Sequence, residues 1–285
     1  MTTSAPTRLG IIAGAGRFPL MVAGGARRAG CHLTIIGLRG FADPALIEYA
    51  DDFRWSGLAR IGKWIRLLKR QRAEKVILAG SVKKSDMFGR LRMLRLLPDP
   101  TSLRIWYRSL RDKRNDTVLM AVADEFAKHG ITMQDCVAYS AEHMAPEGVL
   151  SKTQPTAAQK KDADFGWGIA KEMGRLDIGQ SIAVAETEVI AVEAVEGTDR
   201  MIERAGQLCP RGGWTMVKVA KPEQDMRFDV PTVGPETIEN LKRHGAGMMV
   251  IEAGKTVIID RENMLTAAHR AGIVIVSRVG TAHQS

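Results

Sequence analysis

The segment KPEQDMRFDVPTVGPETI, residues 221–238, carries charged residues of the kinds that act on phosphate esters. It follows the apolar run VKVA, which is typical of the end of a strand, and it places three carboxylates close to Lys221 and Arg227. A carboxylate between two cations stays ionised at neutral pH, so it can hold magnesium or orient water while the cations contact phosphate oxygens. The alternative is a set of surface salt bridges, each contributing almost nothing to stability. A helix predicted to begin near Gly234 favours a functional site, because helix N-termini attract anions.

A second candidate site follows a predicted strand at 189–195. Glu193 and Asp199 could supply oxygen ligands to a hard cation, and the amides of Gly197 and Thr198 could receive a phosphate at the start of a helix. The alternative is structural: glutamates on the solvent face of a strand, followed by Thr198 as an ordinary helix N-cap.

Glycine turns follow two further predicted strands, at 9–13 and 76–79. Gly14-x-Gly16 and Gly80-Ser81 would lie at the same edge of a parallel sheet, where backbone can approach a phosphate. The full dinucleotide fingerprint is incomplete, because Pro19 stands at its third position. These turns therefore predict a phosphate or nucleoside contact, or simply tight turns, with a nicotinamide-binding oxidoreductase as a remote alternative.

The elements that must position these residues indicate an α/β protein of two domains. Strands at 9–13, 33–36 and 76–79 alternate with helices at 19–29, 58–71 and 115–129, which is typical of a Rossmann-like parallel sheet. The second half mixes strands and helices and predicts a hairpin of 247–252 with 256–259. We therefore expect a Rossmann-like domain over 1–135, a mixed α/β catalytic domain over 136–285, and a ligand cleft between them.

Basic charge is concentrated in one block. Of the formal charge of +9, residues 60–114 contribute 17 Lys and Arg against four acids, or +13, which leaves −4 for the remainder. Two amphipathic segments in this block, 58–70 and 87–97, are consistent with helices that have solvated basic faces. The alternative is a peripheral membrane surface in which Trp64 and Phe88 enter the lipid interface. No DNA-reading motif or aromatic stacking platform accompanies the charge, so we expect no nucleic-acid partner.

The remaining composition favours a cytoplasmic protein. Apolar residues make up 45% of the chain, and its three cysteines, Cys31, Cys136 and Cys209, are widely spaced. This pattern suits neither a disulfide framework nor a zinc site.

Five stretches together resemble one family along nearly the whole chain. They are IAGAGRFP near the start, LAGSV at 78–82, DTVLMAVADEF at 116–126, VIAVEAVEGTD at 189–199, and KVAKPEQDMRFDVPTVGPETI at 218–238. They are similar to the two-domain UDP-2,3-diacylglucosamine pyrophosphatases of lipid A biosynthesis, which are unrelated to the calcineurin-like metallophosphoesterases that catalyse the same step.

The resemblance implies magnesium-dependent hydrolysis of UDP-2,3-diacylglucosamine to UMP and 2,3-diacylglucosamine 1-phosphate (lipid X), on the cytoplasmic side of the inner membrane. It implies that Asp225 is essential, and with it we assign catalytic roles to Lys218, Lys221 and Arg227. A nucleotide-sugar or phospholipid binding module without turnover remains the alternative, and a homodimer is left open.

The other expected site residues fall into two sets. We expect substrate contacts from Gly14, Gly16, Gly80, Ser81, Gly197, Thr198, Gln224 and Thr237. We expect magnesium ligands at Asp225, Glu193 and Asp199.

Overall fold

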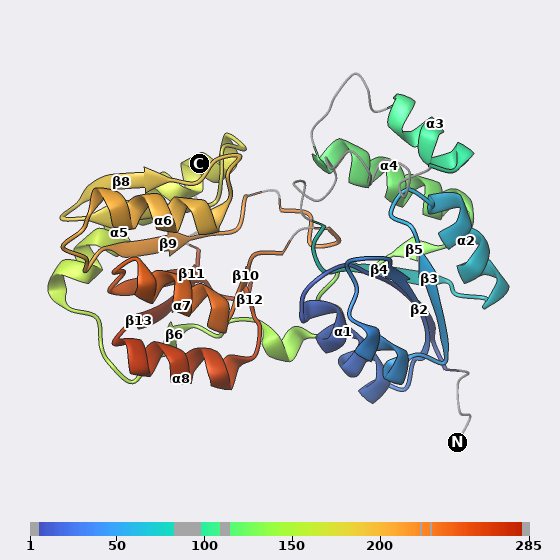
Figure 1. Ribbon diagram of the computed structural model, residues 1–285, viewed down its shortest axis with the longest axis horizontal. Helices are drawn as coiled ribbons and strands as arrows, with labels where there is room; N and C mark the ends of the chain where they lie inside the picture. The colour runs from blue at the N-terminus through green and yellow to red at the C-terminus, as the bar shows by residue number, and fades with distance from the viewer. Residues whose placement is uncertain (1–5, 83–97, 109–114, 223, 229, 281–285) are drawn as a thin grey trace. The chain divides into compact units, whose positions relative to one another are not determined.

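The computed structural model describes residues 6–82, 98–108, 115–222, 224–228 and 230–280 (Figure 1). The chain divides into two compact units. Unit 1 comprises Met1–Ala141 with Met226–Phe228, and unit 2 comprises Glu142–Asp225 with Asp229–Ser285. The main division therefore lies a few residues beyond the predicted position at 135/136. The return of Met226–Phe228 to unit 1 has no counterpart in the sequence analysis.

Unit 1 is built on a five-stranded parallel sheet with the order β3-β2-β1-β4-β5, which confirms the predicted Rossmann-like class. The chain order reverses between β1 and β4, so the glycine turns after these two strands lie at the topological switch point. The strands are β1 (Arg8–Ala13), β2 (His32–Leu38), β3 (Asp52–Ser56), β4 (Lys75–Ala79) and β5 (Thr132–Met133).

Helices cover both faces of this sheet (Figure 1). Alternate strand residues such as Ile12, Ile36 and Val76 pack against α2, α3 and α4, whereas α1 contacts β1, β2 and β4. Burial on both faces accounts for the nearly continuous apolar runs of these strands. The helical segments are α1 (Phe18–Arg28), η1 (Pro44–Tyr49), α2 (Ile61–Arg70), α3 (Pro100–Arg108), α4 (Asn115–Lys128) and, at the boundary, η4 (Ala141–His143).

The predicted membrane role of Trp64 is wrong. Its side chain is only 5% exposed and lies in the core that α2 forms with the sheet. The helical period of α2 places Trp64 on the same face as Ile61, Ile65 and Leu68, so packing accounts for it. The second basic segment, with Phe88, lies outside the described residues.

Unit 2 contains a six-stranded mixed sheet with the order β6-β13-β11-β9-β7-β8. Strands β9, β11 and β13 are parallel, and β7, β8 and β6 run antiparallel to their neighbours. A separate two-stranded parallel sheet pairs β10 with β12. The strands are β6 (Gly148–Val149), β7 (Ser181–Ala185), β8 (Glu188–Val192), β9 (Thr215–Lys218), β10 (Thr232–Val233), β11 (Met248–Glu252), β12 (Val257–Ile258) and β13 (Val274–Arg278).

The predicted hairpin of 247–252 with 256–259 is wrong. Both edges of β11 are occupied, by β9 on one side and β13 on the other, so β12 pairs with β10 instead. The chain does turn at Ala253 and Gly254, but it leaves the sheet there.

The central strands of unit 2 are covered on both faces (Figure 1). One face packs on α6, α7 and α8 through residues such as Met216 and Met249, and the other packs on α5 through Val217 and Val250. The helices are α5 (Ala157–Arg175), α6 (Thr198–Leu208), α7 (Pro235–Arg243) and α8 (Arg261–Ala271).

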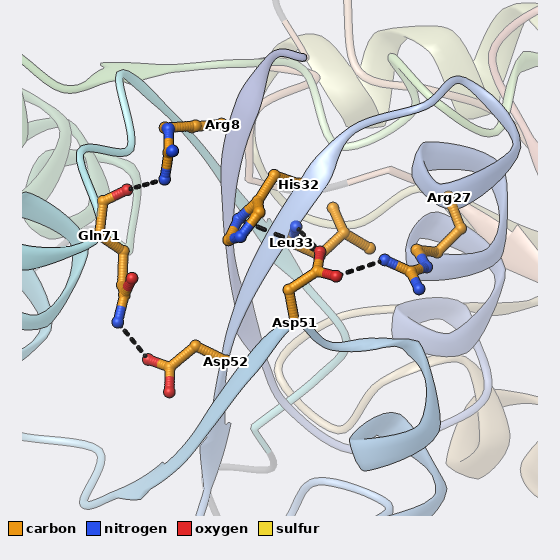
Figure 2. A network of polar contacts seen from close by, with 7 residues as sticks. All are labelled: Arg8, Arg27, His32, Leu33, Asp51, Asp52 and Gln71. Atoms are coloured by element: carbon orange, nitrogen blue, oxygen red, sulfur yellow. Dashed lines mark hydrogen bonds and ion pairs between the residues drawn. The ribbon is translucent and has the colours of Figure 1, made fainter. Parts of the chain in front are cut away.

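A polar network joins the amino ends of the strands of unit 1 (Figure 2). The carboxylate of Asp51, just before β3, accepts the Leu33 N–H of β2 at 2.7 Å and pairs with Arg27 of α1 at 2.8 Å. Beside it, Gln71 donates to Asp52 at 3.1 Å. Ligands of open parallel sheets bind at the opposite, carboxyl edge, so this network stabilises the sheet and takes no part in a site.

The environment of Asp51 makes its contribution to stability depend on pH. Partial burial acts to raise the pKa of Asp51, but the Leu33 N–H and the Arg27 guanidinium outweigh it, so the pKa lies below its usual value. A depressed carboxyl pKa stabilises the fold above the pKa of the unfolded chain. That stabilisation is lost as the pH falls through the folded value, below about pH 4.

We expect Asp51→Asn to speed hydrogen exchange at the Leu33 amide about tenfold at pH 7, because a hydrogen bond to a charged group contributes about 1.5–3 kcal/mol. The ratio of mutant to wild-type exchange rates should shrink towards one below about pH 4, where the wild-type carboxylate becomes protonated. The control is Glu48→Gln, an exposed carboxyl on η1, which should leave the Leu33 amide unchanged. If the ratio of the two exchange rates did not change between pH 7 and pH 4, the Asp51 carboxylate would not be the charged acceptor of the Leu33 N–H.

Candidate active site

Each of the three parallel strands of the six-stranded sheet ends in a charged residue: Lys218 in β9, Glu252 in β11 and Arg278 in β13. The pleat sends alternate side chains to opposite faces. Lys218 shares the face of Met216, towards α6, and Glu252 shares the face of Val250, towards α5. The carboxyl edge of this sheet therefore carries one charged cluster on each face.

The first cluster is centred on Lys218, which is only 7% exposed. Its ammonium donates to the Thr198 hydroxyl at 3.1 Å, and that hydroxyl donates to the Glu193 carboxylate at 2.9 Å. Ser181, which pairs with Lys218 across β7 and β9, lies 3.5 Å from the same hydroxyl. The structure thus brings together three of the predicted site residues, from β9, from the start of α6 and from the segment after β8.

The helix that begins beside Lys218 differs from the prediction at its first residue. Thr198 is not the N-cap; Gly197 is, with a φ of 84° that a residue with a side chain adopts only at a cost. The Thr198 hydroxyl is left to connect Lys218 with Glu193. The first amides of α6 have no carbonyl partner within the helix and carry the positive end of its dipole.

Glu193 is the best placed of the predicted metal ligands. It is 8% exposed, and its Oε2 is buried without a hydrogen-bond partner among the described residues. The carboxylate of Asp199 is exposed and accepts from the Asn240 side chain at 3.4 Å. In the described part of the chain, no group of three or more His, Cys, Asp and Glu side chains is placed to hold a metal. The three-carboxylate magnesium site therefore stays a prediction.

The second cluster holds the peptide of Ala220, at the base of the charged segment. The Glu252 carboxylate, 1% exposed, accepts the Ala220 N–H at 2.8 Å and the Lys171 ammonium at 2.5 Å. Lys171, from α5, also donates to the Ala220 carbonyl at 3.2 Å. Lys255 lies 3.4 Å from the other oxygen of Glu252. The buried Lys171–Glu252 ion pair thus binds both the N–H and the carbonyl of Ala220.

The segment after Ala220 is held in place by hydrogen bonds and an ion pair of its own side chains. Lys221 pairs with Asp177, two residues after α5, and its N–H donates to the Gln224 side chain at 2.9 Å. The predicted phosphate role of Lys221 therefore competes with an ion pair. Thr237 accepts the Gly234 N–H at 3.3 Å and so caps α7. Asp225, partly buried, closes this stretch as the last residue of unit 2 before the chain enters unit 1.

Arg227 belongs to unit 1 rather than to the unit that holds Lys218. Its guanidinium lies 5.0 Å from the ring centre of Phe228 and 3.0 Å from the sulfur of Met120. Phe228 packs on the core of unit 1, and the Met226 carbonyl accepts the Cys136 N–H at 2.9 Å. The four predicted catalytic residues are therefore divided between the two units.

The glycine turns of unit 1 are joined to each other by backbone hydrogen bonds. The Gly14 N–H donates to Ala79, and Ala15 and Ser81 exchange bonds of 2.9 and 3.0 Å. A Cβ on Gly14 would lie 2.8 Å from the Ser81 carbonyl, so glycine is required by close packing. The amides of Gly14 and Ser81 are thus not available to a phosphate. At Gly16, with a φ of 93°, a Cβ would meet open space.

Lys171 and Glu252 are the site residues that the sequence analysis missed. The signal was the glutamate that ends the apolar run MMVIE, residues 248–252. A carboxylate on a strand buried on both faces requires a cation from the covering helix.

Comparison with known proteins gives two domain matches in the same order as the two units. Residues 8–143 match the LpxI N-terminal domain, and residues 146–276 match the LpxI C-terminal domain. The chain belongs to the LpxI family. It is 35% identical over 280 residues to the UDP-2,3-diacylglucosamine pyrophosphatase LpxI of Caulobacter vibrioides, covering 94% of this chain and 96% of the relative. The resemblance to this family that the five stretches predicted is confirmed.

Breaking the ion pair that holds Ala220 should destabilise unit 2. We expect Lys171→Met and Glu252→Gln each to lower the free energy of unfolding by roughly 3 kcal/mol, because each leaves a buried charge unpaired. In thermal unfolding, the double variant should lose less free energy of unfolding than the sum of the losses of the two single variants, since both substitutions remove the same interaction.

Lys255→Met is the matched control, because Lys255 is 46% exposed and reaches Glu252 only at 3.4 Å. Its loss should stay below about 1 kcal/mol. Strictly additive effects of Lys171→Met and Glu252→Gln would contradict the pairing.

Proposed function

We propose that this chain hydrolyses the pyrophosphate bond of UDP-2,3-diacylglucosamine, yielding UMP and 2,3-diacylglucosamine 1-phosphate. The relative's name gives the substrate class. The observation that carries the proposal is Lys218, a buried ammonium with a single hydrogen bond among the described residues, next to the start of α6. A buried cation with unused donors, beside helix amides, requires an anion, and a phosphate supplies one.

The chemistry assigned to unit 2 is charge stabilisation at the diphosphate. The Lys218 ammonium and the first amides of α6 would bind phosphate oxygens, where negative charge must be stabilised as the bridging bond breaks. Thr198 holds the ammonium in place, and Glu193 accepts from that hydroxyl, so the donor geometry exists before substrate binds. Preorganisation of this kind requires no reorientation during the reaction.

Hydrolysis transfers one phosphoryl group to water. The oxygen of water forms a bond to one phosphorus, the bond from that phosphorus to the bridging oxygen breaks, and the other phosphate leaves with the bond's electron pair. The proton of the attacking water passes to a base, which we assign to Asp225. The carboxylate would orient the water and accept this proton, and both roles require it to be ionised.

The donor set fits magnesium in the manner usual for this ion, which takes one or two carboxylates together with substrate phosphates. Glu193 is the first ligand we propose, because its Oε2 is a buried carboxylate oxygen without a hydrogen-bond partner among the described residues. Asp225 is the second we propose. When bound, magnesium would neutralise charge on the diphosphate. Asp199 is the weakest of the predicted ligands, because its carboxylate contacts Asn240.

We place the reaction at the cytoplasmic face of the inner membrane, where a substrate with two acyl chains resides. Among the described residues, no helix combines the length and the apolar character needed to cross a bilayer. The enzyme would therefore meet its substrate from the membrane surface.

Asp225→Asn should reduce the rate of UMP release at least a hundredfold, because a single electrostatic catalytic group usually contributes that much. The measurement is UMP release from UDP-2,3-diacylglucosamine with magnesium and again with EDTA, and EDTA should abolish wild-type turnover. Asp164→Asn, at an exposed carboxyl of α5 in the same unit, is the control and should retain full rate. Retention of more than about a tenth of the rate by Asp225→Asn would exclude the assignment. Tight binding without any UMP release would indicate a binding module.

Lys218→Met should lower kcat/KM at least tenfold, with most of the loss in kcat if the ammonium acts on the transition state. Thr198→Val should show a smaller loss in the same parameter, since it removes only the hydroxyl that positions Lys218. Lys242→Met, at a lysine in the last turn of α7, is the control. Unchanged kcat and KM in Lys218→Met would show that the buried ammonium has a structural role only.

A further inference from the structure

Helix α3 presents an apolar face to solvent. Leu103, Trp106 and Tyr107 are 46%, 64% and 77% exposed, respectively. Their spacing of three and four residues places them side by side along one face of the helix. Single exposed apolar residues are ordinary, but two aromatic side chains and a leucine on one short helix form a patch.

The exposed face is not needed to attach α3 to unit 1. The opposite face does this, because Ser102 and Ile105 are buried and Ile105 lies in the core shared with α2 and α4. The buried Asp99 carboxylate accepts the Ser102 N–H at 2.9 Å and the Lys63 N–H of α2 at 3.0 Å. Helix α3 is thus fixed to α2 on one side while the apolar residues point away from the contact.

The neighbouring helix α2 is basic, whereas on the side of α4 Arg104 lies 3.8 Å from Glu125. Helices α2 and α3 together contain no acidic residue and six basic ones: Lys63, Arg66, Lys69, Arg70, Arg104 and Arg108. Arg66, Lys69 and Arg70 are exposed on α2. An apolar patch beside such a surface suits a partner that is anionic outside and apolar within.

We propose that α3 anchors the protein to an anionic lipid bilayer, with Trp106, Tyr107 and Leu103 in the interface and the basic residues of α2 on the headgroups. Tryptophan and tyrosine favour this depth, because each has an apolar ring and a polar tip. Basic residues near an anionic leaflet add electrostatic attraction. This surface replaces the one predicted around Trp64, whose side chain is buried.

The occupant follows from charge complementarity. A bilayer with anionic lipids matches the exposed Arg66, Lys69 and Arg70 of α2, a helix without an acid, and its apolar interior accepts Trp106 and Tyr107 at the same time. A second copy of the same basic face would instead bring like charges together. The proposal gives the proposed function a route to a membrane-embedded substrate, but it does not depend on turnover.

The test is co-sedimentation of the full chain with substrate-free vesicles of pure phosphatidylcholine or of phosphatidylcholine with 30% phosphatidylglycerol. We expect binding to the anionic vesicles only, weakened at 1 M salt, where the Debye length falls to about 3 Å. Trp106→Ser with Tyr107→Ser should weaken partitioning at least tenfold, or about 1.4 kcal/mol. Arg66→Gln, Lys69→Gln and Arg70→Gln together should weaken it similarly and flatten the salt dependence.

Leu208→Ser is the matched control, because Leu208 is a 60% exposed apolar residue at the end of α6 in unit 2. It should bind vesicles as the wild type does. Equal binding by the Trp106/Tyr107 variant, equal binding to neutral vesicles, or no vesicle binding would each overturn the proposal. So would self-association of the wild type that this variant abolishes, because a second copy would then cover the face. Since the vesicles contain no substrate, failure of hydrolysis leaves the result intact.

Discussion

The central strands of unit 2 are covered by helices on both faces, and this constraint decides where polar chemistry can occur. A charged side chain within β9 or β11 would lie in an apolar layer at a high cost in solvation. At the last residue of each strand, hydrogen-bond and ion-pair partners from the covering helix or from the segment beside it offset that cost. Lys218 donates to Thr198 on one face, and Glu252 pairs with Lys171 on the other. The carboxyl edge of the sheet is therefore where the fold tolerates concentrated charge.

The two clusters differ in how their charges are paired. Around Glu252 the carboxylate is paired directly with Lys171, and both polar groups of Ala220 are bound, so this cluster fixes the backbone from which the charged segment departs. Glu252 Oε1 makes no hydrogen bond among the described residues but lies 3.4 Å from the Lys255 ammonium. Around Lys218 the pairing is indirect, through a hydroxyl, and Glu193 retains a buried oxygen without a hydrogen-bond partner among the described residues. A directly paired ion pair rigidifies its surroundings, whereas an ammonium held only through a hydroxyl keeps donors for a ligand. The same edge thus supplies both a rigid base and a binding surface.

Much of the fold could be predicted from apolar periodicity, because buried parallel strands and amphipathic helices each have a characteristic spacing of apolar residues. The failures have physical causes. Strand β3 was missed because DFRWS, an edge strand, alternates two aromatic residues with polar ones and lacks the continuous apolar run of the buried strands. The hairpin after β11 failed because strand pairing depends on distant partners. In the site, charged residue types pointed to the right segments. The pairings of Lys171 with Glu252 and of Lys221 with Asp177 depend on where α5 and the residues just after it pack, so spacing along the chain could not reveal them.

The return of Met226–Phe228 to unit 1 has a consequence for synthesis on the ribosome. Phe228 can pack on the core of unit 1, and the Cys136 N–H can donate its hydrogen bond to the Met226 carbonyl, only after some 85 further residues have followed Ala141. At elongation rates of about 5–20 residues per second, that interval lasts roughly 4–17 seconds. During this time the nascent first unit exposes the apolar surface that Phe228 will cover. The N-terminal domain of this chain is thus first in sequence, yet it is completed only when most of the second has been translated.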